Sequence, residues 1–156
     1  MKYKLTEETK VVCGHTLHRI VCVTAFASVS VGDIGGWVES ESNLSQCGNA
    51  WVYGNADVYG NAWVCGDAKV CGNAEVCGDA KVYEVTDFIV LKNSWSSGRY
   101  FTYTASNKKW KVGCFYGTGE ELIAKAYKDS ELSGKCYEAS VNYVEEIERI
   151  KKEQKK

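Results

Sequence analysis

The feature that most constrains this chain is a six-residue phrase repeated from Gly48 to Tyr83, which reads GNAWVYGNADVYGNAWVCGDAKVCGNAEVCGDAKVY. Each phrase carries Ala, a variable residue, Val, then Tyr or Cys, then Gly, then Asn or Asp. Alanine and valine therefore each recur every six residues, at Ala50, Ala56, Ala62, Ala68, Ala74 and Ala80 and at Val52, Val58, Val64, Val70, Val76 and Val82. A fixed short period of this kind predicts a stacked, solenoid-like architecture.

The spacing inside each phrase predicts one short strand and one corner. Ala and Val lie two positions apart, so an extended chain puts both on one face and the variable residue on the other. Gly followed by Asn or Asp then turns the chain, because these residues tolerate a positive φ. A helix is excluded, because its period is about 3.6 residues and a glycine in every phrase would cost about 1 kcal/mol each.

Three phrases that turn the same way close one coil of eighteen residues, so we expect a parallel β-helix of two to three coils over residues 47–83. Val52 would then stack on Val70. Asp57 would stack beside Glu75, a like-charge pair that is tolerable only if it is solvated. The stretch from Cys47 to Val82 resembles the left-handed β-helix built from hexapeptide repeats, and this resemblance alone implies the left hand.

The segments on either side of the repeat predict smaller units. Residues 1–46 read as short strands and turns that form an N-terminal β cap, and Leu44 falls in register with the alanine of the later hexads. Residues 84–156 predict a strand, a β-hairpin and two helices. The first helix opens with a capping box from Thr118 to Glu121, and the second runs from about Lys135 to Glu153. The expected fold is thus mainly β, with a C-terminal α+β unit.

Two tryptophans take outward positions on the first coil. Trp51 and Trp63 occupy the variable slot on two different faces of a narrow prism, where large apolar side chains need cover. We expect the flanking segments to provide that cover. The alternative is that both are interface residues for a partner or for a second copy in a homo-oligomer.

The C-terminal hairpin interleaves aromatic and basic residues. Aromatic rings beside cations suit single-stranded nucleic acid or a nucleotide. The favoured alternative is that the aromatic residues are core, since one strand face of aromatics is usually buried. The candidate binding residues are Trp95, Arg99, Tyr103, Lys108, Lys109, Trp110 and Lys111.

The eight cysteines do not form a recognisable metal or disulfide pattern. The chain has no C-x-x-C pair, and Cys13 with His15 and His18 is the only close candidate for a zinc site. The favoured alternative is a short strand and turn that carries these histidines. With no signal peptide at its start, we expect reduced thiols, no metal and no cofactor. Cys47 and Cys65 would stack at about the 4.8 Å strand spacing, an arrangement that seldom orients a disulfide well.

Proteins with hexapeptide β-helices are best known as trimeric acyltransferases, which use a catalytic histidine on a loop that interrupts the coil. Here the hexads run without interruption, and His15 and His18 both precede them. No nucleophile motif, phosphate-binding loop or pair of carboxylates appears elsewhere. We therefore predict no catalytic residue and no enzymatic activity.

Nearly the whole chain resembles a group of small phage and prophage proteins whose activity is not generally assigned. The shared elements are KLTEET at Lys4–Thr9, GDIGGW at Gly32–Trp37, the hexads, and the segment Asn93–Tyr127. This chain departs from the group in its cysteines at the tyrosine position and in its short coil count. Because no activity is assigned to the group, the resemblance carries over no catalytic residue.

The resemblance, with the lack of enzyme motifs, implies a phage-encoded binding protein in the cytoplasm of the bacterial host. We expect an inhibitor or decoy of an antiviral defence component, such as a CRISPR effector or a nucleotide messenger. The expected partner is a host protein or ribonucleoprotein, or else nucleic acid or a nucleotide. No apolar run approaches the roughly 20 residues of a membrane span. The alternative is a self-assembling scaffold, in which the open ends of the coil stack.

Overall fold

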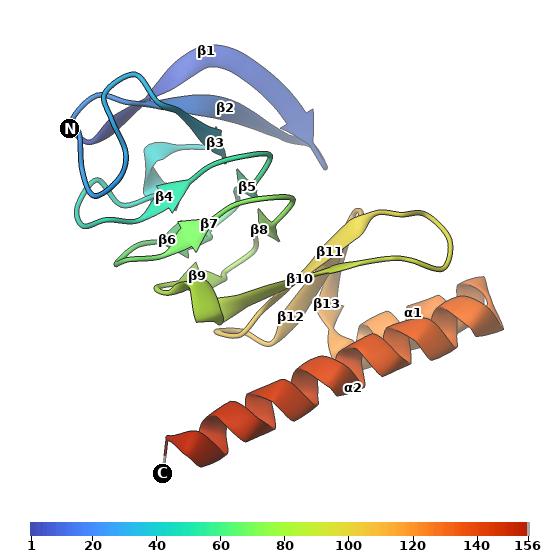
Figure 1. Cartoon of the computed structure of the whole chain (residues 1–156). Coiled ribbons are helices and arrows are strands. Elements are labelled where there is room, and N and C mark those ends of the chain that lie inside the picture. Colours follow the sequence, from blue (N-terminus) through green and yellow to red (C-terminus); the bar gives the residue numbers. More distant parts are fainter. Residues whose placement is uncertain (156) are drawn as a thin grey trace.

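In the computed structural model, which describes residues 1–155, the hexads form six strands of two residues each (Figure 1). Each strand holds the variable residue and the valine of one hexad: β4 (Trp51–Val52), β5 (Asp57–Val58), β6 (Trp63–Val64), β7 (Lys69–Val70), β8 (Glu75–Val76) and β9 (Lys81–Val82). The corner glycines from Gly54 to Gly78 have φ values of 64° to 67°. This is the left-handed region that the Gly-Asn and Gly-Asp pairs predict.

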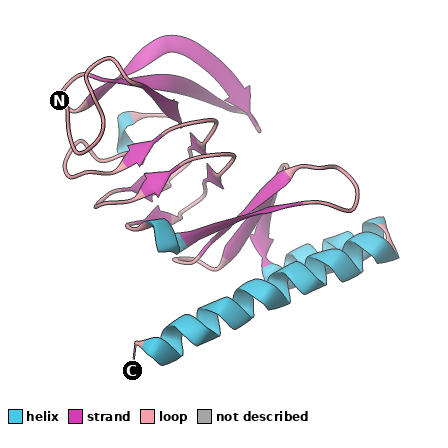
Figure 2. Cartoon of the chain, in the orientation of Figure 1, coloured by secondary structure: helices cyan, strands magenta, loops and turns pink. Residues whose placement is uncertain are grey.

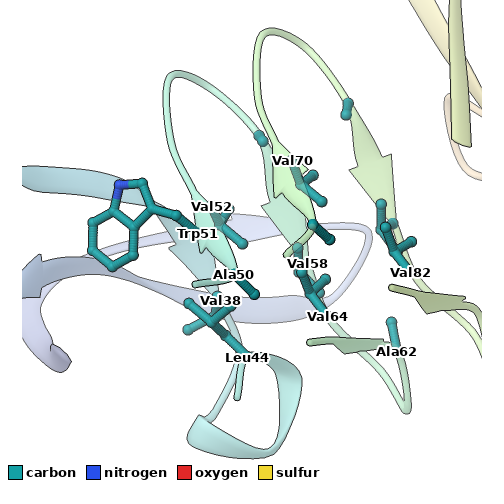
Figure 3. Close-up of a cluster of buried hydrophobic side chains, with 14 of the residues drawn as sticks. Val38, Leu44, Ala50, Trp51, Val52, Val58, Ala62, Val64, Val70 and Val82 are labelled. Atoms are coloured by element: carbon teal, nitrogen blue, oxygen red, sulfur yellow. The ribbon is translucent and has the colours of Figure 1, made fainter. Parts of the chain in front are cut away.

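The strands of the repeat pair in parallel with the strands eighteen residues away. β4 pairs with β7, β5 with β8 and β6 with β9, so that Val52 lies beside Val70. Trp51 N donates to Ala68 O at 3.0 Å, which shows how one layer hydrogen-bonds to the next. Figure 3 shows the valines gathered on the inner side, with Trp51 projecting the other way. The predicted eighteen-residue spacing is confirmed.

The N-terminal segment extends one side of the repeat into a five-stranded sheet of order β1-β2-β3-β5-β8. β1 (Tyr3–Val12) and β2 (His15–Cys22) form an antiparallel hairpin, and β3 (Ile34–Val38) pairs with β2 and, in parallel, with β5. We call β1, β2 and their turn the arm. In Figure 1 the arm reaches across the top of the repeat toward the C-terminal sheet.

The register between the N-terminal segment and the hexads differs from the predicted one. Leu44 pairs with Val64 and Trp37 with Asp57, separations of twenty residues rather than eighteen. The two extra residues lie after the 3₁₀ turn η1 (Glu41–Asn43, N-cap Ser40), between Leu44 and Val52, which are eight positions apart instead of six. The expectation that Leu44 takes an alanine position is therefore wrong, because Leu44 takes a valine position.

The C-terminal unit begins with the 3₁₀ turn η2 (Val85–Asp87) and continues as a four-stranded antiparallel meander. Its strands are β10 (Phe88–Lys92), β11 (Tyr100–Thr104), β12 (Lys109–Val112) and β13 (Phe115–Thr118). The sequence predicts three strands, so β13 is a strand that the hairpin assignment misses. β13 pairs with β12 through a two-residue turn of Gly113 and Cys114, in which Gly113 has a φ of 57°.

Two helices complete the unit, and Figure 2 shows them on the side of the sheet away from the repeat. α1 (Gly119–Asp129) opens with the predicted capping box of Thr118 and Glu121. α2 (Glu131–Gln154) begins earlier than predicted, because the side chain of Ser130 caps it by accepting a hydrogen bond from Ser133 N at 3.0 Å. The helices bury Leu122, Ala126, Tyr137, Val141 and Val144.

The C-terminal sheet closes the last layer of the repeat with hydroxyl groups. Glu75 N, on β8, donates to Thr102 Oγ1 at 2.9 Å, and Lys81 N, on β9, donates to Ser106 Oγ at 2.8 Å. These backbone donors would otherwise point toward the next layer of the stack. Both ends of the repeat are thus covered by the chain itself, by β3 with η1 at one end and by β11 with its following turn at the other.

Candidate functional site

The aromatic residues of the C-terminal hairpin lie in the core. Tyr103 is 6% exposed and Trp110 is 2% exposed, and their rings pack together at 5.0 Å. Trp95 is partly buried, with its ring 4.8 Å from that of Tyr137 on α2. The hypothesis that Tyr103 and Trp110 stack on bases is therefore wrong, because the docked helices cover them. The alternative interpretation as core residues is the one that their burial supports.

The basic residues of the same stretch do not form one surface. Lys111 is buried, with Nζ 3.5 Å from the Sγ atom of Cys13 on the arm. Lys109 lies over the ring of Tyr116, and Lys108 stands exposed in the β11–β12 turn. Arg99 is exposed and lies at the end of the loop before β11. Of the predicted binding residues, Arg99 thus remains as an accessible cation beside a cavity.

This cavity has a volume of about 530 Å³ and opens between the β10–β11 loop, the β12–β13 turn and the two helices. Its cations are Arg99 and Lys125, the latter from α1. Hydroxyl groups come from the loop and from α2, and aromatic rings come from the sheet and from α2. These are Ser96, Ser97 and Ser133 for the hydroxyls and Phe101, Phe115 and Tyr137 for the rings. We call it the helix–sheet cavity.

The loop that carries Arg99 is held in place by Asn93. Asn93 is buried, and its Oδ1 accepts hydrogen bonds from Trp95 N at 3.1 Å and Ser96 N at 2.9 Å. Its backbone N donates to Arg99 O at 2.8 Å, and its Nδ2 donates to the Tyr137 hydroxyl at 3.3 Å. The loop is therefore fixed to both the sheet and α2, so the cavity wall is pre-formed.

The charge balance of the helix–sheet cavity is positive. Lys125 lies 3.5 Å from Asp129, and both side chains are more than half exposed, so this ion pair is weak. Arg99 makes no ion pair with any residue of the described chain. With two cations and the single carboxylate of Asp129 in its lining, the cavity suits an anionic group.

A second group of functional side chains lies beneath the arm. His15 Nδ1 is 2.8 Å from Glu39 Oε2, and the other oxygen of Glu39 accepts a hydrogen bond from Gly60 N at 3.0 Å. The His15 ring packs on Tyr59 with their centroids 4.7 Å apart, and the Tyr59 hydroxyl donates to Glu75. We call His15, Glu39, Tyr59 and Glu75 the arm cluster.

Burial perturbs the ionisation of the residues in and around the arm cluster. It raises the pKa of the Tyr59 hydroxyl, and it raises the pKa of Glu75 above its ordinary 4.5. It also raises the pKa of the adjacent Cys77 thiol to about 11. Asp57 stays partly buried beside Glu75 because Lys10 of the arm pairs with it at 2.6 Å. The expectation that this like-charge pair needs solvation is thus wrong, since a cation screens it instead.

A histidine held by a carboxylate has the geometry of a general base. Sequence reasoning missed the arm cluster because two of its members come from the N-terminal segment and two from the repeat, and only the docking of the arm brings them together. The signal that could have found part of it is the eighteen-residue stack, which places Tyr59 and Glu75 on neighbouring layers of one side. No group of three or more histidine, cysteine or acidic side chains within residues 1–155 could hold a metal ion.

The two outward tryptophans differ in their surroundings. Trp51 is 4% exposed, covered by the Tyr3 ring at 6.4 Å and by the Phe26 ring at 5.5 Å. The N-terminal segment therefore supplies its cover, and Trp51 is not available as an interface residue. Trp63 is partly exposed, and its role as an interface residue stays a prediction.

Comparison with known proteins finds similarity over a short segment of the chain. No protein-family model matches this chain. The chain is 33% identical over 60 residues to the uncharacterized acetyltransferase YdcK of Escherichia coli (strain K12). The match covers 33% of this chain and 18% of the relative, so the chain spans less than a fifth of that protein. In the part of the chain that the structure describes, no helix combines the length and the apolar character needed to cross a membrane.

Proposed function

We propose that the repeat is a short left-handed parallel β-helix of the hexapeptide type. Its support is the parallel pairing eighteen residues apart, the inward valines and alanines, and a glycine in the left-handed region at each corner. In this view the coil is a rigid spacer between the arm and the C-terminal unit. The ligand-binding surface then belongs to the flanks, where the cavity lies.

We further propose that the protein is a non-catalytic, phage-encoded binding protein that captures a phosphorylated nucleotide. It would act in the host as a decoy for a nucleotide messenger of antiviral defence. The observation that carries this proposal is the helix–sheet cavity, whose lining combines the cations Arg99 and Lys125 with aromatic rings. The phage origin and the link to defence rest on the sequence resemblance described above.

The chemistry of the cavity fits the two halves of a nucleotide. A guanidinium presents a fork of N–H donors that matches phosphate oxygens in pairs, and serine hydroxyls add further donors. The rings of Phe101, Phe115 and Tyr137 offer apolar area for a base. A volume of about 530 Å³ lies within the range of small-molecule sites.

Titration calorimetry on the full chain tests this proposal with cyclic dinucleotides, ADP and ATP, and with the matching nucleosides as phosphate-free probes. We expect binding of one or more phosphorylated ligands and none of the nucleosides. Arg99→Gln should weaken binding about tenfold or more, because a charge-assisted hydrogen bond is lost. Lys108→Gln is the matched control, because Lys108 is exposed in a turn outside the cavity, and it should bind as wild type does.

Two outcomes would contradict the nucleotide proposal. One is the absence of heat with every nucleotide up to about 1 mM, which corresponds to only about 4 kcal/mol of binding free energy. The other is binding that Arg99→Gln leaves unchanged. Capture of a CRISPR effector equally by wild type and Arg99→Gln, without nucleotide binding, would favour a protein target instead.

An acyltransferase is the second candidate function, favoured by the His15–Glu39 pair together with the similarity to YdcK. In such an enzyme His15 would remove a proton from an acceptor hydroxyl or amine, and Glu39 would orient the ring. A thiol-release assay with acetyl-CoA and simple amines checks this. Turnover that disappears in His15→Ala and persists in His18→Ala would replace the binding proposal, whereas the binding proposal expects no turnover.

The scaffold alternative finds less support in the fold. End-to-end stacking of coils needs unpaired backbone groups at the ends of the repeat. Here Thr102 and Ser106 accept hydrogen bonds from the last layer, and β3 with Leu44 pairs with the first. We therefore do not propose self-assembly through the coil ends.

A further inference from the structure

Two cysteines far apart in the sequence meet where the arm touches the C-terminal sheet. The Sγ atoms of Cys13 and Cys114 are 2.7 Å apart, closer than unbonded sulfur atoms ordinarily approach. Both residues are exposed, so a small oxidant can reach them. The remaining cysteines of the described chain make no sulfur–sulfur contact of this kind, and Cys22 and Cys77 are buried.

Tight turns hold both thiols in place. Cys13 and Gly14 form the two-residue turn of the arm, with φ values of 47° and 84°, the pattern of a type I′ hairpin. Cys114 follows Gly113 in the equally short turn between β12 and β13. Because each turn is anchored by a paired strand on both sides, the two sulfur atoms face each other without any loop having to move.

The arm is already docked over the site by other contacts. Lys10 pairs with Asp57, and His15 packs on Tyr59, so the tip of the arm is held beside the repeat. Buried Lys111 donates to Cys13 Sγ at 3.5 Å, and Cys13 Sγ lies 3.7 Å from Gly113 O. The two thiols are therefore positioned by the fold before any covalent bond forms.

We propose that Cys13 and Cys114 are a redox modification site that closes into a disulfide and locks the arm to the C-terminal sheet. This proposal does not depend on nucleotide binding. The oxidant is a low-molecular-weight disulfide such as glutathione disulfide. One cysteine thiolate attacks it, forms a mixed disulfide and releases one glutathione thiolate. The second cysteine thiolate then displaces the other glutathione, so two protein thiols are oxidised and one glutathione disulfide is reduced to two thiols.

The local electrostatics set the pH dependence of the reaction. Burial of the thiol, with the neighbouring Cys114 thiol, raises the pKa of Cys13, and Lys111 opposes this shift. Because the thiolate is the reactive form, closure should speed up as the pH rises above neutrality. In a reducing cytosol the pair stays open, and it closes when the glutathione pool becomes oxidised.

The test uses the full chain equilibrated in glutathione redox buffers, quenched with N-ethylmaleimide and mapped by non-reducing peptide mass spectrometry. We expect a Cys13–Cys114 linked peptide within single chains. We also expect the melting temperature to rise by roughly 10 °C on oxidation, because the bond closes a loop of about 100 residues. Both signals should be absent in Cys13→Ser and in Cys114→Ser, and both should reverse with dithiothreitol.

Cys47→Ser is the matched control, because Cys47 is also exposed but lies away from the arm tip, and it should keep both signals. Circular dichroism of the reduced serine variants verifies that they fold, since both positions are exposed turn residues. The proposal is overturned if a folded wild type yields no Cys13–Cys114 peptide in oxidising buffer. It is equally overturned if oxidation links other cysteines, such as Cys47 with Cys65, and Cys13→Ser leaves the melting shift intact.

Discussion

At the scale of single residues, the most informative group is the Glu75 carboxylate beneath the arm. It accepts a hydrogen bond from the buried Tyr59 hydroxyl, yet burial raises its pKa above 4.5. The folded state therefore disfavours the ionised form relative to the unfolded chain. Below about pH 4.5 Glu75 is protonated in both states, so its burial does not lower the stability. The loss of stability develops as the pH rises from the unfolded to the folded pKa, and it is complete above the folded pKa.

We predict that Glu75→Gln raises the free energy of unfolding at pH 7, because it removes a carboxylate whose ionised form is disfavoured by burial. Glutamine keeps an oxygen that accepts from Tyr59 and removes the desolvated charge. Urea unfolding at pH 7 and pH 4 measures this, and the advantage should vanish at the lower pH. Glu7→Gln, at an exposed position on β1, should show no such gain. A loss of stability at pH 7 would contradict the assignment.

At the scale of elements, the join between the repeat and the C-terminal sheet depends on side-chain hydroxyls rather than on a strand ladder. Thr102 Oγ1 accepts from Glu75 N, and Thr102 is 1% exposed. Ser106 Oγ accepts from Lys81 N, and Ser106 is exposed. The two hydroxyls thus make the same kind of hydrogen bond, but Thr102 is buried and Ser106 is exposed. Water can therefore replace only the Ser106 hydroxyl.

We predict that Thr102→Val destabilises the protein by about 1–3 kcal/mol, because it leaves a backbone donor unsatisfied at a site closed to water. Valine keeps the shape and the strand propensity of threonine, so packing changes little. Ser106→Ala should cost about 0.5 kcal/mol or less, because water can reach Lys81 N. Chemical denaturation of both variants gives the comparison, and equal losses at the two positions would show that the hydroxyls do not cap the repeat.

At the scale of the whole molecule, local periodicity predicted the repeat well and the contacts between units poorly. The hexads set the valine and alanine positions, because period and corner chemistry are local properties. β13 was missed because its sequence, FYGT, shows no alternation of apolar and polar residues that would distinguish a strand from the loop leading into α1. Tyr103 and Trp110 became core because α1 and α2 dock on them, a contact that short-range patterns do not report.

The candidate sites, too, depend on contacts between units that local sequence patterns do not predict. Arg99 and Lys125 come from separate elements, and only the packing of α1 against the sheet gives them a common cavity. Cys13 and Cys114 are 101 positions apart, so their meeting depends on the length of the repeat and on the reach of the arm. The stacking of Cys47 and Cys65, which the period does predict, produces no sulfur contact among the described residues.

The number of hexads also determines how long the arm must be to reach the C-terminal sheet. Adding eighteen residues to the repeat would move the C-terminal unit away by one strand spacing, about 4.8 Å, without rotating it. Adding a single hexad would instead rotate that unit by a third of a turn about the axis of the repeat, and the β12–β13 turn would then lie on another side of the repeat. The arm, whose tip meets that turn, therefore fits this number of hexads, and a longer coil would require a longer arm to keep the same contact.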